Sequence, residues 1–192
     1  MAQQNQPNNN LGGFADARFI LINGRFWDSH LTRRYVQGQV WLNEFTNLLL
    51  ESFLQIRGSP MHEKMQWNKN TKKYEPSPCP LEQFGSFEIL KYGMKHAFTL
   101  YKPHEFNPMI FARRTQELLT LRNDMTHEVG RWAQANPRDT LEKLLKKMTV
   151  ISKYLLDCRR HDFQLHRRIR NFKSNCEKEL DQMQRWKHEN MY

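Results

Sequence analysis

The chain has 192 residues, a length that suits one domain with a sizeable core. Its 30 Lys and Arg outnumber its 20 Asp and Glu, and the resulting charge of +10 favours nucleic acid or another acidic surface as partner. Three cysteines without a short paired spacing argue against a disulfide framework and against a zinc knuckle. The amino terminus is polar, and no segment approaches ~18 uninterrupted apolar residues. We therefore expect a soluble intracellular protein, cytoplasmic or nuclear, without a membrane partner.

The amino-terminal part combines a polar leader with a hairpin signal. Residues 1–13 are rich in Gln, Asn, Pro and Gly and lack apolar periodicity, which predicts a disordered leader outside the fold. The pair Asn23-Gly24 then stands between apolar runs, which is the strongest short-range signal for a β-hairpin. A turn that leads into the first helix fits the same residues equally well.

Apolar residues at three- and four-residue steps predict a first helix that begins between Asp28 and Thr32 and ends at Arg57. The segment 58–85 is rich in Lys, Asn and Pro and shows no period, so a long exposed loop is predicted there. A second helix is expected from Leu81 or Ser86 to Tyr101, because a proline follows shortly after that position.

The third helix has a well-formed start, with Asn107 as N-cap and Pro108 at the first helical position. It is expected to end within a few residues of His127. The fourth helix opens with Asp139-Thr-Leu-Glu142, which resembles a capping box. Its apolar spacing continues to Met183, so this helix either runs on or breaks near Cys158 and resumes.

Long amphipathic helices without βαβ alternation predict an all-α fold, a four-helix bundle. A long C-terminal amphipathic helix and, on the hairpin interpretation, a short N-terminal β-hairpin would complete it. The helical domain is expected over 14–158, followed by a basic amphipathic helical tail over 159–192.

One short motif lies near the end of the predicted third helix. Within Leu121–His127, Arg122 is followed by the polar Asn123 and, four positions later, by His127. A bundle that carries Arg-Asn-Asp-Met-Thr-His at the end of its third helix resembles the HEPN superfamily, whose signature is Arg, a polar residue, and His after a gap of four to six. The resemblance implies an RNA-binding or RNA-cleaving domain that commonly works as a homodimer. Acidic residues upstream sometimes accompany the motif, and the candidates are Glu82, Glu88 and Glu105.

The chemistry of the motif suits cleavage of RNA without a metal or cofactor. Arg122 would hold the scissile phosphate, and His127 would move the proton of the 2′-OH or of the leaving 5′-oxygen. Asn123 could orient either partner through its amide. The products would be a 2′,3′-cyclic phosphate and a 5′-hydroxyl, and DNA would resist because it lacks the 2′-OH.

Helix geometry sets a condition on this hypothesis. Residues five apart on a helix point roughly 140° from each other, so Arg122 and His127 converge only if the helix end redirects the histidine or two copies pair about a twofold axis. A purely structural interpretation also fits. Arg122 would then pair with Glu117 or Asp124, and His127 would be a polar residue near a helix C-terminus.

A second feature is a basic run in the last third of the chain. Arginine forks at helical spacing suit phosphates, and neighbouring aromatic rings could stack on bases or pack on a partner helix. A solvated helix face or a nuclear-localisation signal explains the same charges. Cys158, His161 and His166 fall near metal-ligand spacing, but so few and loosely spaced residues predict no metal site. The candidate RNA-binding residues are Arg159, Arg160, Arg167, Arg168, Arg170 and Lys173.

Two hypotheses of different classes therefore stand. The first is an RNA-binding HEPN-like domain, with metal-independent endoribonuclease activity if catalysis is retained. The second is a non-catalytic helical adaptor that binds RNA or a protein partner through its basic tail and amphipathic helix.

Overall fold

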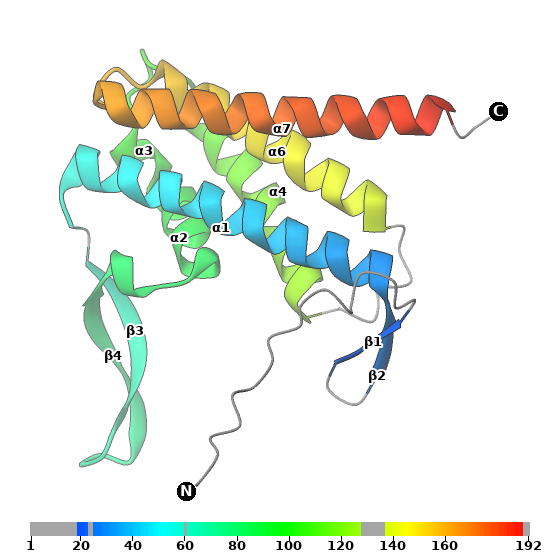
Figure 1. Ribbon diagram of the computed structural model, residues 1–192. Helices are drawn as coiled ribbons and strands as arrows, with labels where there is room; N and C mark the ends of the chain where they lie inside the picture. The colour runs from blue at the N-terminus through cyan, green and yellow to red at the C-terminus, as the bar shows by residue number, and fades with distance from the viewer. Residues whose placement is uncertain (1–18, 23–24, 60, 128–136, 190–192) are drawn as a thin grey trace, which may run out of the picture.

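The computed structural model describes residues 19–22, 25–59, 61–127 and 137–189, so the leader predicted over 1–13 lies outside the described residues. Most of the described residues are helical, which confirms the prediction of a mostly helical protein. Figure 1 shows the long helices packed together, with two hairpins projecting from them. The elements are β1 Phe19–Ile22, β2 Arg25–Asp28, α1 Ser29–Arg57, β3 Met61–Asn68, β4 Lys73–Pro80, η2 Leu81–Gln83, α2 Ser86–Lys95, α3 Ala97–Leu100, α4 Pro108–His127, α6 Pro137–Asp157 and α7 Phe163–Glu189.

The predicted apolar stripes form the core. In α1 the residues at three- and four-residue steps are buried, and α6 buries a matching stripe of leucines, Met148 and Ile151. The start of α4 follows its sequence signal, because the Asn107 carboxamide oxygen accepts a hydrogen bond of 2.9 Å from the backbone N–H of Met109. Local capping and burial of a stripe thus act together in setting these helices.

The second predicted helix is divided in the structure. α2 ends at Lys95, and His96 leaves helical geometry with φ −106° and ψ 13° before α3 begins. Close packing fixes α2 against α1, because a Cβ atom added at Gly93 would lie only 2.7 Å from Cζ of Phe53. The glycine that weakens the helix signal is therefore the residue that allows the two helices to approach.

The N-terminal hairpin forms as one of the two interpretations predicted. β1 pairs with β2 in antiparallel register, with Ile20 opposite Trp27 and Ile22 opposite Arg25. The Asn23-Gly24 pair itself lies outside the described residues.

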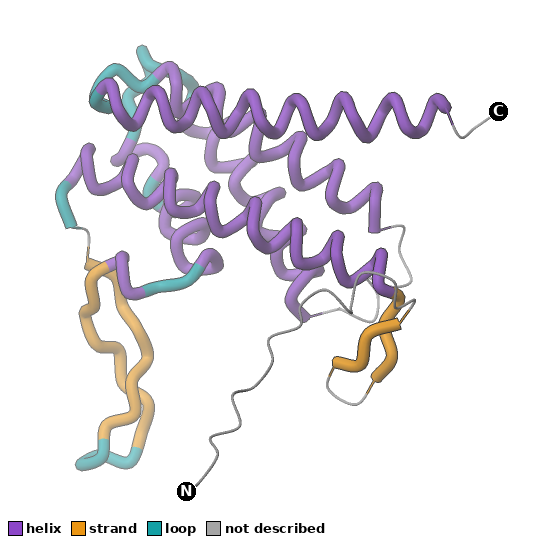
Figure 2. The backbone as a smooth tube through the Cα atoms, in the orientation of Figure 1, coloured by secondary structure: helices purple, strands orange, loops and turns teal. Residues whose placement is uncertain are grey.

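The prediction of a loop over 58–85 is wrong, because a second antiparallel hairpin occupies most of this segment (Figure 2). Prolines at alternate positions of β4 argued against a strand, since proline cannot donate to a β-ladder. Alternate positions of one strand, however, direct their backbone nitrogens to the same side. Pro76 and Pro78 lie opposite Met65 and Glu63, and their backbone nitrogens can point away from β3. The hydrogen bonds between the two strands can therefore form without an N–H group at these prolines.

α7 belongs to the helical body rather than to a separate tail. Phe172 of α7 is buried between Trp41 and Phe45 of α1, with ring centroids 5.5 and 5.6 Å away. The predicted long helix breaks at Cys158, directly after the end of α6, and Asp162 caps the new helix by accepting a 2.7 Å hydrogen bond from the backbone N–H of Leu165. The question of continuity is thereby resolved in favour of a break.

A buried hydrogen-bond chain fixes this break against α1. Nδ1 of His161 lies 3.0 Å from the carbonyl oxygen of Leu155, and since a carbonyl only accepts, Nδ1 carries the proton. Nε2 then accepts from the Ser52 hydroxyl at 2.7 Å, and Ser52 accepts from the Tyr101 hydroxyl at 3.0 Å. Burial lowers the pKa of His161 to about 4, which agrees with a neutral imidazole.

Candidate functional site

Arg122 of the predicted motif lies half-buried against α2. Its guanidinium carbon is 5.3 Å from the centroid of the Phe87 ring. Its Nε atom donates to the Ser86 hydroxyl at 3.4 Å, and its Nη1 atom donates to the Asn123 side-chain oxygen at 3.2 Å. The structure therefore brings Arg122 and Asn123 together and directs the arginine toward α2 rather than toward open solvent.

Glu88 is the upstream acid that acts electrostatically on this arginine. Burial lowers the pKa of Arg122, and electrostatic interactions with Tyr35 and Glu88 oppose that effect. All three candidate acids have partners other than Arg122. Glu88 lies 3.1 Å from Nε2 of His62, Glu82 accepts from Ser59, and Glu105 pairs with Arg160. α2 and α4 thus bring a carboxylate and a guanidinium into one neighbourhood.

His127 is the last residue of α4, five positions after Arg122 on the same helix. Backbone positions five apart on a helix are separated by about 140° around its axis. The side chain of His127 lies outside the described residues, so the structure does not decide between redirection of the histidine by the helix end and pairing of two copies of the motif.

Three of the predicted RNA-binding cations form ion pairs within the chain. Arg160 pairs with Glu105 at 2.8 Å, Arg168 pairs with Glu51, and Lys173 pairs with Glu177 at 2.8 Å. The Glu105 side chain is only 2% exposed; burial alone would raise its pKa, but the hydrogen bonds from Arg160 and from the Lys102 backbone N–H lower it to about 2. Arg160 therefore holds the turn before α7 in place.

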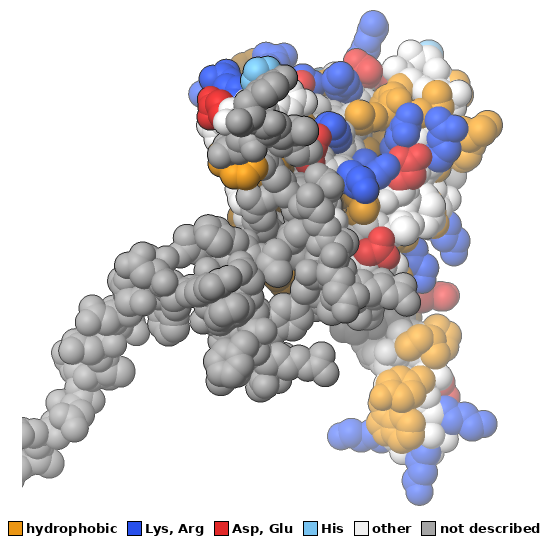
Figure 3. Space-filling view, turned by 90° about the vertical axis from the view of Figure 1, so that its right-hand side faces the viewer, with side chains coloured by type: hydrophobic (Ala, Val, Ile, Leu, Met, Phe, Trp, Pro, Cys, Tyr) orange, Lys and Arg blue, Asp and Glu red, His pale blue; other side chains and the backbone are white. Residues whose placement is uncertain are grey.

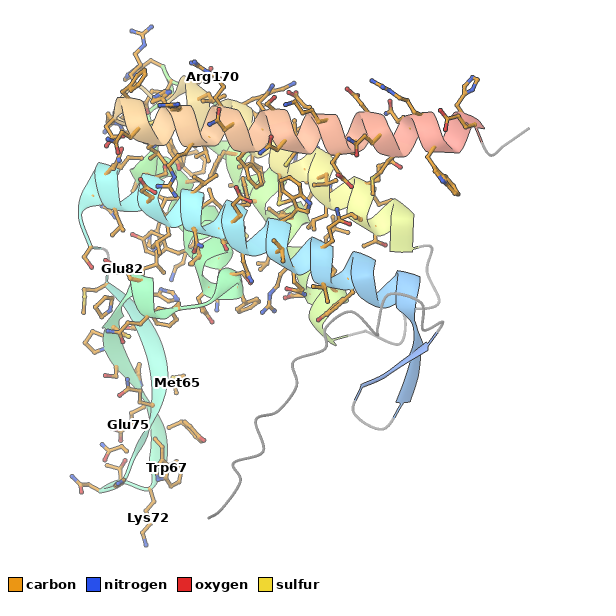
Figure 4. The ribbon with its side chains drawn as sticks, in the orientation of Figure 1. Met65, Trp67, Lys72, Glu75, Glu82 and Arg170 are labelled. Atoms are coloured by element: carbon orange, nitrogen blue, oxygen red, sulfur yellow. The ribbon has the colours of Figure 1, made fainter. Side chains whose placement is uncertain are left out.

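The remaining cations form an exposed stripe on α7. Arg167 and Arg170 lie on the side opposite the buried Ile169 and Phe172, and Arg170 points away from the helical body in Figure 4. Helical spacing extends this stripe to Lys178 and Arg185, with Asp181 as an acidic neighbour. We call Arg167, Arg170, Lys178 and Arg185 the α7 stripe. Arg159 is also exposed, in the turn before the helix.

Sequence reasoning missed an exposed apolar face on the β3–β4 hairpin. Residues facing one side of β3 and their partners on β4 are solvent-exposed, and the Trp67 and Tyr74 rings touch edge to face with centroids 5.2 Å apart. Figure 3 shows hydrophobic side chains gathered on this projection and basic side chains at its end. The signal was present in the alternation along 61–67. The hairpin face comprises Met61, Glu63, Met65, Trp67, Tyr74, Pro76 and Pro78.

A pocket of about 290 Å³ lies at the base of this hairpin and is lined by Arg57, Met61, Tyr92 and His96. The His96 and Tyr92 rings lie 4.4 Å apart, and burial together with the charges of Lys95, Arg57 and His62 lowers the pKa of His96. The pocket thus combines a partly buried imidazole with one cationic side chain, that of Arg57.

Among the described residues, no group of three or more His, Cys, Asp or Glu side chains is placed to hold a metal ion. His166, one of the loosely spaced metal candidates, lies with Nε2 3.0 Å from the carbonyl oxygen of Cys158. None of the described helices has the length and apolar character needed to cross a membrane.

Comparisons with known proteins found no protein family, curated protein or solved structure that matches this chain.

Proposed function

We propose that this chain is a helical RNA-binding domain that holds the phosphate backbone on the α7 stripe. The observation that carries the proposal is the exposure of Arg167 and Arg170 one turn apart on a helix whose opposite side is fixed in the core. Guanidinium groups at that spacing bind phosphates through paired N–H donors, and the net charge of +10 favours a polyanion. The ion-paired Arg160 and Arg168 contribute less, because their charges are already compensated within the chain.

Charge reversal of the stripe tests this function. The double variant Arg167→Glu/Arg170→Glu is expected to weaken binding of single-stranded RNA by about tenfold or more, measured by fluorescence anisotropy. The matched control Arg113→Glu/Lys143→Glu removes the same charge from exposed positions on α4 and α6. Equal losses of RNA affinity in the two variants would show that binding depends on net charge alone and not on the α7 stripe. Unchanged RNA affinity in the stripe variant, with a protein captured through α7, would favour the adaptor hypothesis.

A second proposal is metal-independent RNA cleavage by an HEPN-like four-helix bundle acting as a homodimer. The arrangement of Arg122 and Asn123 supports it, because a guanidinium that donates to the neighbouring amide, with the negative charge of Glu88 acting on it, resembles the expected motif. Twofold pairing would place Arg122 of one protomer near His127 of its partner. Arg122 would neutralise the phosphate while His127 transfers the proton.

Cleavage of RNA in the presence of a chelator tests the second proposal. Wild-type protein is expected to leave 2′,3′-cyclic phosphate ends, and both Arg122→Lys and His127→Ala are expected to abolish cleavage while thermal unfolding stays cooperative. Mixing the two inactive variants should restore part of the activity, because a mixed dimer contains one intact pair. Full cleavage activity in His127→Ala would contradict the proposed cleavage mechanism, while the proposal of RNA binding by the α7 stripe would still stand.

A further inference from the structure

The hairpin face is an unusual surface for a protein whose helices bury their apolar stripes well. Met65, Trp67 and Tyr74 are 57%, 53% and 65% exposed, although they adjoin one another across two paired strands. The opposite side of the same hairpin is anchored, since His62 packs its ring 5.1 Å from Phe84 and Cys79 is buried. The hairpin is thus held to the body by one side and offers the other side to a ligand.

The turn of the hairpin supplies positive charge beside this face. Lys69 and Lys72 are exposed in the turn, and among the described residues no ion pair joins either of them to a carboxylate, whereas Lys73 lies on the other side of the hairpin, opposite Asn68. The nearby Glu75 points to the other side of the hairpin in Figure 4, where its carboxylate accepts hydrogen bonds of 2.6 Å from both Asn68 and Thr71. At the other end, the face reaches through Met61 the pocket that the cationic Arg57 lines. Apolar rings therefore lie between two cationic ends.

We propose that the hairpin face binds an unpaired stretch of RNA, with bases against Trp67 and Tyr74 and phosphates at the turn lysines. This inference rests on the proposed RNA-binding function and adds the class of RNA, because only unstacked bases can contact the rings. The edge-to-face arrangement of the two rings leaves ring surface exposed for stacking. Flat prolines at positions 76 and 78 extend the contact surface along β4.

The shape of the hairpin favours RNA over a membrane surface. An inserting hairpin presents apolar residues at its tip, whereas residues 69–72 of this turn are Lys-Asn-Thr-Lys. The apolar residues instead run lengthwise along the strands, so a ligand lying along the hairpin can contact rings and lysines together. A single strand with alternating bases and phosphates has that form.

Removal of the Trp67 ring is the direct experiment, carried out on the full chain with an unstructured RNA and a duplex of the same length. Trp67→Ala is expected to weaken single-strand binding by about 5- to 150-fold, while duplex binding changes little. Trp67→Phe should retain most of the affinity because it keeps a ring. Phe98→Ala, which removes an exposed aromatic ring from α3, is the matched control and should have no effect.

A turn variant separates binding from folding of the hairpin. Lys72 has a positive φ of 53°, which glycine adopts without steric cost, so Lys72→Gly removes a charge and leaves the turn favoured. Its thermal stability should be unchanged or higher, and the slope of log affinity against log salt should become shallower by about 0.7 for single-stranded RNA. Glu63→Gln, on the same face, should strengthen binding.

The outcomes distinguish this inference from the proposed function. If the α7 stripe variant loses RNA affinity while Trp67→Ala and Lys72→Gly bind as wild type, the hairpin proposal fails and the α7 proposal stands. Loss of binding to vesicles of phosphatidylcholine and phosphatidylserine in Trp67→Ala, with RNA affinity unchanged, would overturn the hairpin proposal in favour of a membrane surface. Parallel loss of single-strand and duplex binding in Trp67→Ala would also contradict it.

Discussion

Replacement of Arg160 by alanine is expected to lower the free energy of unfolding by about 3 kcal/mol, although Arg160 belongs to the basic run predicted to bind RNA. Its partner Glu105 has a side chain only 2% exposed, so removal of the guanidinium leaves a buried carboxylate with no cationic partner and only the donors of Lys102 and Cys158. The partial exposure of Arg160, at 33%, keeps the loss below that of a fully buried pair. Urea unfolding at neutral pH measures it.

Arg167→Ala is the matched control for that experiment. Arg167 is exposed on α7, and its removal should change the free energy of unfolding by less than about 0.5 kcal/mol while weakening RNA binding. Loss of Arg160 is thus expected mainly to lower stability, whereas loss of Arg167 is expected mainly to weaken RNA binding. Similar stability losses in both variants would show that Arg160 does not hold the turn through Glu105.

Acid is expected to destabilise the protein through His161. The imidazole titrates near 6.5 in the unfolded chain and only near 4 in the folded protein, because burial disfavours its charge. Protons therefore bind the unfolded state first, and stability present above pH 6.5 is lost as the pH falls toward 4. The loss can reach about 3 kcal/mol, at ~1.4 kcal/mol per pKa unit. Urea unfolding at several pH values across this range measures it.

His161→Asn isolates the contribution of this histidine. The asparagine keeps a donor near the Leu155 carbonyl oxygen but cannot gain a proton. The stability of the variant protein should therefore depend less on pH between 6.5 and 4 than that of the wild type. His166, Arg160 and Glu105 also surround the site, and the difference between the two profiles removes their shared contribution. The exposed His104→Gln variant should follow the wild-type profile. If the free energy of unfolding changed with pH in the same way in wild type and His161→Asn, His161 would not be the source of the acid sensitivity.

The helices could be predicted from sequence because each carries its own local signals. The Asn107-Pro108 start and the stripe of α1 are determined by capping and burial within a single segment. The β3–β4 hairpin was missed because three prolines in 73–80 normally exclude a strand, and their tolerance depends on the side to which each nitrogen points. That property belongs to the pair of strands and not to either alone.

The candidate site was only partly predictable for a related reason. The sequence identified Arg122, Asn123 and the basic residues of α7, but the partners of a charge come from distant segments. Glu105 reaches Arg160 and Glu51 reaches Arg168 only after the helices pack, and these contacts distinguish the ion-paired arginines from the α7 stripe. Similarly, the proximity of Glu88 to Arg122 depends on how α2 meets α4.

The salt dependence of single-stranded RNA binding tests the central proposal most directly. Affinity should fall linearly on a log–log scale as salt rises, and Arg167→Gln/Arg170→Gln should make that slope shallower by about 1.4, because two phosphate contacts are lost at about 0.7 each. The exposed pair Arg113→Gln/Lys143→Gln should leave the slope unchanged. A slope that is the same in wild type and in the α7 variant would contradict phosphate binding by the α7 stripe.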